Sequence, residues 1–232
     1  FVFGGITWRW VDGGVEFIAE EAVETIDKGR FDLLVVLLQS LHKLFPQKSP
    51  TAEDWRRTRI EGFFKDLSRP EIYQRIRDRL LQLETIEIDK LKALGHALLY
   101  FSPELVPFLV PVILQSSSHE LQQMVSVVIV HLSQRDIGPL EKIVEQYGTE
   151  MGDKLLAILN RLQGDTVNKI LFRMCDHSSD KVRRKAIKEL IGRDPKYAQK
   201  LFALIDDPSK EVRTSILAAF ANQRSRALEN LL

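Results

Sequence analysis

The chain has 232 residues, of which 44% are hydrophobic and 28% charged, with 33 Lys and Arg against 32 Asp and Glu. This composition is typical of a globular protein with a sizeable core, and the balanced charge excludes a protein that coats nucleic acid or an anionic membrane with its whole surface. The single cysteine excludes an internal disulfide, so we expect a reducing, cytoplasmic location. The longest apolar runs, 105–114 and 125–132, are too short to span a bilayer, and we expect no membrane partner.

Residues 1–14 differ in pattern from the rest of the chain. Segments 1–3 and 6–11 are rich in β-forming residues and are bounded by glycine pairs, which predicts a short N-terminal β-hairpin. Trp8 and Trp10 are two residues apart and therefore share one face of a strand. Since an isolated hairpin is marginally stable, we expect it to cap the first helices or to be the remnant of an upstream domain. An exposed ligand surface is the alternative.

From residue 15 the apolar residues recur at helical spacing, so we expect an N-terminal helical segment over residues 15–84. Gly29 predicts a break and Pro46 a stop, with a soft boundary at 46–50. Basic and aromatic residues interleave after Trp55, which suits nucleic acid, but nine acidic residues balance nine basic ones over 51–90. We favour a buried aromatic stripe there. The predicted helices cover 15–28, 30–44, 51–67 and 69–83.

A repeat begins near residue 85. Five apolar residues recur at separations of 30, 30, 31 and 30, and each opens a predicted helix that follows a polar turn, as at 148–150. Shorter helices are predicted between them, over 103–114, 136–147, 165–175 and 195–205. A fixed period of this length indicates a solenoid in which stacked helix pairs share a continuous core. The recurring residues are Leu91, Leu121, Met151, Val182 and Val212.

The segments 176–190 and 206–220 resemble HEAT repeats of the short type found in phycobilisome-lyase-like proteins. In each, an aspartate precedes a Val-Arg pair by one turn, and Pro107 and Pro111 look like the kinking proline of the first HEAT helix. The resemblance implies an all-α fold, an α-α superhelix (HEAT/ARM-like solenoid) over 85–232, with the short β-hairpin before it. It also implies an inter-repeat ladder, which we assign to structure, with ligand contact as the alternative. The ladder residues are Asp176, Arg183, Asp206 and Arg213.

Basic residues concentrate in the last third, where 151–232 hold 16 basic and 10 acidic residues. The resemblance implies that the second helix of each repeat lines a concave groove. Arg184 and Lys188 are four residues apart and share one helix face. Such a groove would bind an acidic protein segment or a phosphate backbone, whereas the alternative is a solvated face balanced by Asp180 and Glu189. The candidate partner-binding residues are Lys154, Arg183, Arg184, Lys188 and Arg213.

No catalytic, metal-binding or cofactor motif is expected. The five histidines have no zinc spacing, and Cys175 beside Asp176 and His177 is read as core filler, because adjacent helical residues point roughly 100° apart. We therefore predict a non-enzymatic protein–protein interaction scaffold without metal or cofactor. The alternative is a DNA-binding or DNA-repair protein of the HEAT-like alkylpurine glycosylase type that uses the basic groove. A chromophore lyase is a third possibility, although nothing marks a bilin site.

Overall fold

The computed structural model is all-α and forms two compact units, Phe1–Leu132 and Ser133–Leu232, divided in the last turn of one helix. Each unit is described by itself below. The side chains of residues 2–3, 6–7, 14–17, 19, 55–60, 145–151, 198–199 and 222–229 are outside the description. The structure describes residues 2–3, 6–7, 14–43, 55–83, 87–194 and 197–229.

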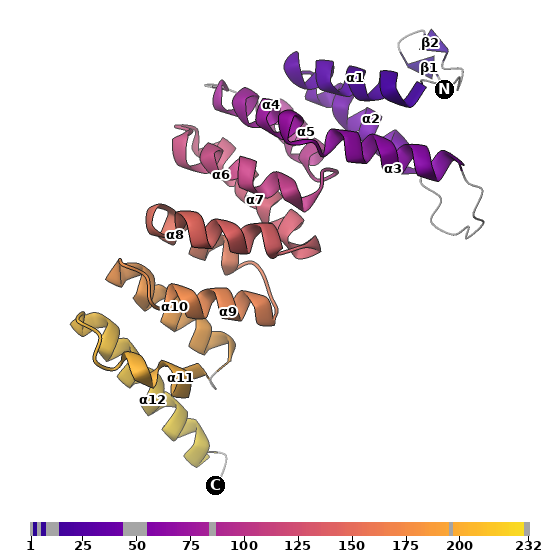
Figure 1. Cartoon of the computed structure of the whole chain (residues 1–232). Helices are drawn as coiled ribbons and strands as arrows, with labels where there is room; N and C mark the ends of the chain where they lie inside the picture. The colour runs from indigo at the N-terminus through magenta and orange to yellow at the C-terminus, as the bar shows by residue number, and fades with distance from the viewer. Residues whose placement is uncertain are drawn as a thin grey trace. The chain divides into compact units, whose positions relative to one another are not determined.

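The first unit holds two short strands and seven α-helices in its described part (Figure 1). The strands pair antiparallel, Val2 opposite Thr7 and Phe3 opposite Ile6, and the remainder of the predicted hairpin, with Trp8 and Trp10, lies outside the described residues. The elements are β1 (Val2–Phe3), β2 (Ile6–Thr7), α1 (Gly14–Asp27), α2 (Phe31–Lys43), α3 (Trp55–Leu67), α4 (Pro70–Leu81), α5 (Ile88–Leu98), the 3-10 turn η1 (Pro103–Leu105), α6 (Val106–Gln115) and α7 (His119–Arg135).

Gly29 ends α1, where the sequence predicted a break. Its φ of +68° is in the left-handed region, and Arg30 closes the turn by donating its N–H to the Thr25 carbonyl at 3.0 Å. A side chain at this position would also lie within 2.9 Å of Nη2 of Arg79. The positive φ therefore favours glycine here, whereas the Arg79 guanidinium is the far end of a flexible side chain that can move aside.

The helices on either side of residue 84 pack against one another. Helix α2 packs along α5, and α4 packs along α6, while α1 contacts α2, α3 and α4. Tyr73 of α4 is buried and its hydroxyl lies 2.7 Å from Oγ of Ser102, just before η1. The predicted boundary at 84/85 thus does not separate two independently packed parts of the first unit.

The second unit begins with a helix longer than the sequence predicted. Helix α8 (Gly138–Leu159) is continuous over 22 residues, so the predicted turn at 148–150 between two helices is wrong. One glycine inside a helix costs only about 1 kcal/mol relative to alanine, which helix-forming neighbours offset. The other elements are α9 (Asp165–Met174), α10 (Asp180–Arg193), α11 (Tyr197–Leu201), the 3-10 turn η2 (Phe202–Leu204) and α12 (Lys210–Glu229).

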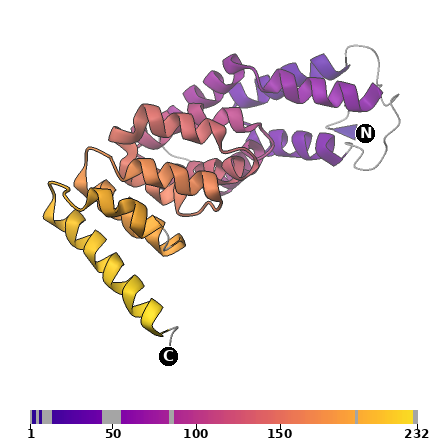
Figure 2. The same cartoon turned by 60° about the horizontal axis from the view of Figure 1, so that its bottom comes forward.

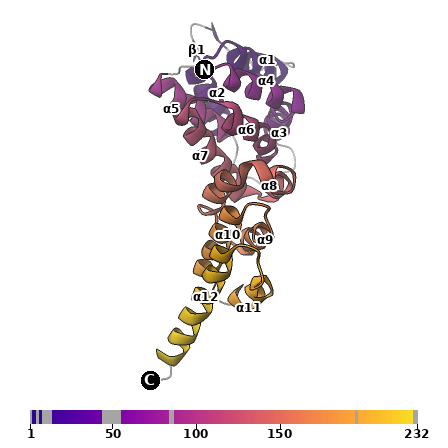
Figure 3. The ribbon, with the colours of Figure 1, turned by 90° about the vertical axis from the view of Figure 1, so that its left-hand side faces the viewer.

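Two helix pairs stack in the second unit. Helix α9 packs along α10, α11 packs against α12, and α10 lies between α8 and α12 (Figures 1 and 3). The inward faces carry the buried apolar residues, among them Val182 and Ala186 on α10 and Val212 and Ile216 on α12. Helix α12 continues beyond the other helices of this unit (Figures 2 and 3). None of the described helices is long and apolar enough to cross a membrane.

Candidate functional site

Helix α10 carries most of the basic residues predicted to bind a partner. Its first turns are joined to α8 by ion pairs. Lys181 and Lys185 both reach Asp153 of α8, with Nζ–Oδ distances of 2.8 and 2.9 Å. Hydrogen bonds from these two lysines, Lys181 first, lower the pKa of the Asp153 carboxyl below its ordinary value. All three side chains remain exposed, so this cluster lies at the surface of the seam between the two helices.

Arg183 is buried, and this corrects its prediction as a groove residue. Its Nε and Nη2 donate to the two carboxylate oxygens of Asp207 at 2.8 and 2.9 Å, and Nη1 donates to the carbonyls of His177 and Ser178. The guanidinium holds the pKa of Asp207 below its ordinary value, and the carboxylate in turn raises the pKa of Arg183. With its donors used inside the unit, Arg183 is a structural residue.

The ladder uses a different carboxylate from the one expected. Asp176 and Asp206 are both exposed, and the acid that bridges the two helix pairs is Asp207. Its Oδ1 also accepts the N–H of Ser209 at 2.8 Å, a local turn that aims the carboxylate at Arg183. Asp206 and Asp207 are adjacent in the sequence, and the geometry of the loop directs the carboxylate of Asp207 toward Arg183. Arg213 donates Nη1 to the carbonyls of Asp207 and Pro208.

The contact between α8 and the α9–α10 pair uses different residues at the positions equivalent to Arg183 and Asp207. Gly152 of α8 stands where α10 has Arg183, and His177 stands thirty residues before Asp207. A Cβ on Gly152 would lie 2.5 Å from a methyl of Val182 and 3.2 Å from Nε2 of His177, so the helix approaches the loop closely. Nδ1 of His177 accepts the N–H of Ser179 at 2.9 Å, which repeats the turn made by Asp207.

Arg184 and Lys188 are the two predicted site residues left at the surface of α10. Both are exposed, they lie one turn apart, and neither side chain makes a hydrogen bond or ion pair with another described residue. We call these two residues the α10 basic face. Lys154 of α8 is half-buried and has interactions of its own, so it is not part of this face.

Arg193 is a well-connected residue that sequence reasoning missed. Its Nη1 and Nη2 donate to the carbonyls of Leu162 and Leu159 at 2.7 and 2.8 Å, and its Nε donates to Glu189. It thereby satisfies carbonyls at the C-terminal end of α8, a role that a basic residue in the last turn of α10 signals only weakly. Its donors hold the C-terminal end of α10 against the C-terminal end of α8.

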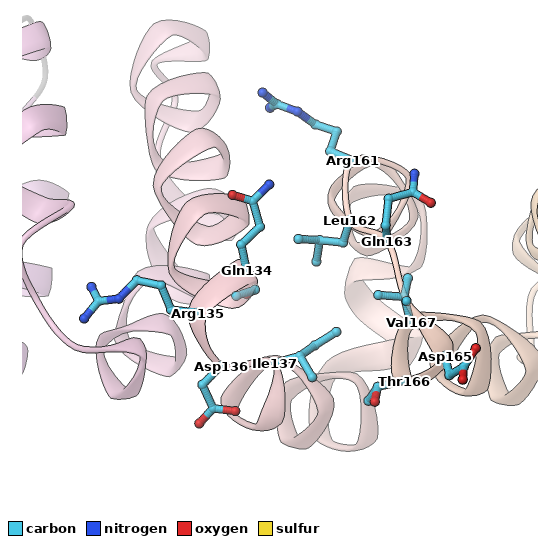
Figure 4. A pocket seen from close by; sticks show the side chains of 12 residues that line it. Gln134, Arg135, Asp136, Ile137, Arg161, Leu162, Gln163, Asp165, Thr166 and Val167 are labelled. Atoms are coloured by element: carbon cyan, nitrogen blue, oxygen red, sulfur yellow. The ribbon is translucent and has the colours of Figure 1, made fainter.

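An open depression of about 460 Å³ lies between the α7–α8 loop and the α8–α9 loop, within the second unit. Its interior is formed by Ile137, Leu162 and Val167, whereas Arg135 and Arg161 point away from it (Figure 4). Because no charged groups converge on its centre, the depression has the character of a surface hollow rather than a reaction site.

The residues considered for chemistry are placed as follows. Cys175 is buried, and desolvation, followed by the charge of Asp176, raises its pKa to about 12, so its thiol is not a nucleophile at neutral pH. No group of three His, Cys, Asp or Glu side chains in the described part of the chain could hold a metal ion.

The aromatic and basic cluster in α3 is described only in part. Its predicted member Trp55 and the arginines that follow lie outside the described side chains, while Phe63 is buried and packs edge-on against Phe64 at 5.3 Å. Comparison with known proteins adds no relative, since no family model matches the chain and no curated protein sequence matches it.

Proposed function

We propose that this protein is a non-catalytic protein–protein interaction scaffold, built from HEAT-like repeats, whose α10 basic face binds an acidic segment of a protein partner. The observation that carries the proposal is the state of Arg184 and Lys188. The other basic residues of the same run are engaged within the unit, Lys181 and Lys185 with Asp153, and Arg183 with Asp207. Arg184 and Lys188 are exposed cations one turn apart on a helix that is fixed to its neighbours, so together they can bind two carboxylates of a partner.

The count of available cations also favours a protein partner over a nucleic acid. A phosphate backbone is bound tightly when many Lys and Arg side chains contact it at once. On the basic run of α10, Arg184 and Lys188 are the exposed cations without an ion pair among the described residues, and the exposed Lys181 and Lys185 share the single Asp153 carboxylate. An acidic peptide needs fewer contacts, and its affinity can come from apolar contacts as well. Binding to duplex DNA is therefore an outcome that the experiment below must separate.

The test is charge reversal of the α10 basic face. Fluorescence anisotropy compares the parent, Arg184→Glu/Lys188→Glu and a control with the same change of net charge, Lys142→Glu/Lys169→Glu, whose two lysines are exposed on α8 and α9. The probes are labelled peptides of mixed Glu and Leu composition and a labelled DNA duplex, each in a salt series. We expect at least tenfold weaker peptide binding for the first variant alone. Equal peptide affinity for both variants, or tighter binding of duplex with a steep salt slope, would overturn the proposal.

A further inference from the structure

The last two helix pairs carry similar side chains at equivalent positions, thirty residues apart, but differ in burial. Ile187 of α10 is 0% exposed, whereas its equivalent in α12, Leu217, is 53% exposed. Leu190 is likewise 0% exposed, whereas its equivalent, Phe220, is half-buried. Helix α12 packs on α10 and covers it, and no described helix packs on α12 in the same way. The described part of α12 that carries Leu217 and Phe220 is therefore apolar and is not covered by another described helix.

The aromatic residues differ in the same direction but by less, since Phe172 is 36% exposed and Phe202 is 54% exposed. Phe172 of α9 packs against Tyr197 of the next helix pair, with ring centroids 6.2 Å apart. Its equivalent, Phe202 of η2, is 54% exposed and contacts Phe220 of its own pair at 5.2 Å. Among the described helices none packs on the far side of this pair, and a contiguous exposed apolar patch marks an interaction site.

Arg213 adds a specific chemistry to this surface. It begins a stripe with Leu217 and Phe220, at i, i+4 and i+7 on α12, which corresponds to the stripe of α10 that faces α12. Like Arg183, it donates Nη1 to two loop carbonyls, at 2.6 and 3.0 Å. In Arg183 the remaining edge, Nε and Nη2, holds a carboxylate of the next helix pair. In Arg213 this edge contacts no carboxylate among the described residues.

We propose that the terminal face, defined as Phe202, Arg213, Leu217 and Phe220, docks an apolar element of a partner protein that carries an Asp or Glu side chain. The Nε–Nη2 edge of Arg213 receives that carboxylate as Arg183 receives Asp207. A planar guanidinium fixed by backbone carbonyls is preorganised for bidentate carboxylate binding, and apolar surroundings strengthen the pair. The proposal rests on the proposed function as a scaffold but concerns a different surface from the α10 basic face.

The occupant is a partner rather than a second copy of this chain. The acid-bearing loop that would match the terminal face is the one that holds Asp207, and in this chain that carboxylate is already buried against Arg183. A second copy would have to open its own stack to present it. A partner with a free acidic and apolar element has no such cost.

The test is selection of a displayed library of random peptides on the immobilised full chain. The parent is compared with Arg213→Gln, with Leu217→Glu, and with Thr214→Glu, a control on a neighbouring face of the same helix. We expect the parent and Thr214→Glu to enrich peptides that combine an acid with apolar residues. The best peptide should bind at least tenfold more weakly to Arg213→Gln and to Leu217→Glu, and its Asp→Asn or Glu→Gln form should lose as much on the parent.

Two controls separate the possible failures. Because Arg213 also binds loop carbonyls, the Leu217→Glu variant serves as the test if Arg213→Gln does not fold. The same selected peptide is measured on Arg184→Glu/Lys188→Glu, where unchanged affinity shows that the terminal face acts independently of the α10 basic face. No enrichment above the Leu217→Glu background, enrichment without an acidic residue, or sedimentation of the parent as a dimer that Leu217→Glu dissociates would overturn the proposal.

Discussion

Two seams of the second unit solve the same packing problem with different side chains. Between α10 and the α12 pair, Arg183 and Asp207 form a buried bidentate ion pair. Between α8 and the α10 pair, the equivalent positions hold Gly152 and His177, which are so near that a Cβ on Gly152 would lie 3.2 Å from the imidazole. Arg183 and Asp207 join their helix pairs through hydrogen bonds between charged groups. Gly152 has no side chain, so α8 can approach the next helix pair closely and no buried charge has to be paired at this position. A repeat can thus keep its helices while it changes the physical basis of the contact between neighbours.

The largest effect is expected from Arg183→Ala, which breaks the first of these seams. The substitution leaves the buried Asp207 carboxylate without its guanidinium partner and two partly buried loop carbonyls without their donor. Loss of one member of a buried ion pair typically costs about 3–5 kcal/mol of unfolding free energy. Urea unfolding of the parent and variant measures it. A loss smaller than that of an exposed substitution such as Lys169→Ala would contradict the structural role.

The next largest effect is expected from Gly152→Ala, which breaks the second seam. Alanine is the better helix former by about 1 kcal/mol. Its methyl group would nevertheless meet a Val182 methyl at 2.5 Å, and overpacking of this kind costs about 1–3 kcal/mol. Thermal unfolding should show a lower midpoint. In a double-mutant cycle with Val182→Ala the two losses should be less than additive, and strict additivity would argue against the contact.

The pH dependence of stability should distinguish the seams. Because Arg183 holds the pKa of Asp207 below its unfolded value of about 3.9, the pair stabilises the fold above that value and the contribution is lost as pH falls through the lower, folded pKa. Asp207→Asn removes this contribution. The gap in unfolding free energy between parent and variant should narrow from about pH 5 downward. Parallel curves over that range would contradict the assignment, since the other carboxylates are common to both proteins.

The smallest effect is expected from Asp153→Asn, which removes the surface ion cluster of the α8–α10 seam. Asp153 serves two lysines, but all three groups are exposed and screened by solvent. Exposed ion pairs contribute less than about 1 kcal/mol, and high salt weakens them further. The loss of unfolding free energy should be well below that of Arg183→Ala. It should also shrink in 1 M salt, because the Debye length falls to about 3 Å there. A loss comparable to that of Arg183→Ala would show that burial does not separate the two clusters.

Several local features of the fold could be read from the amino-acid pattern. The helices that contain Val182 and Val212 begin at Asp180 and Lys210, close to their predicted starts. The break at Gly29 was equally local, because its left-handed backbone favours glycine wherever it occurs. The prediction of a turn at 148–150 was wrong, because glycine and polar residues permit a turn without requiring one.

The functional assignments depended on contacts that pattern cannot show. The basic run on α10 has one charge pattern, yet it divides into lysines bound to Asp153, an arginine bound to Asp207, and the exposed Arg184 and Lys188. Asp206 and Asp207 are indistinguishable by type, and only the turn at Ser209 selects the second.

The sequence by itself determined the helical period, the thirty-residue spacing and the concentration of positive charge in the last third of the chain, because helix formation follows from apolar residues recurring every three to four positions. Only the tertiary structure decided which of these charges are available. Arg183 and Arg213 both follow a valine and make the same loop contacts through Nη1, but Asp207, in the loop before α12, supplies a carboxylate to the first, and no described element supplies one to the second. The physical reason is that burial and ion pairing arise between residues of different helix pairs. A periodic pattern shows which residues share one face of a helix, but it does not show which other helix or loop covers that face.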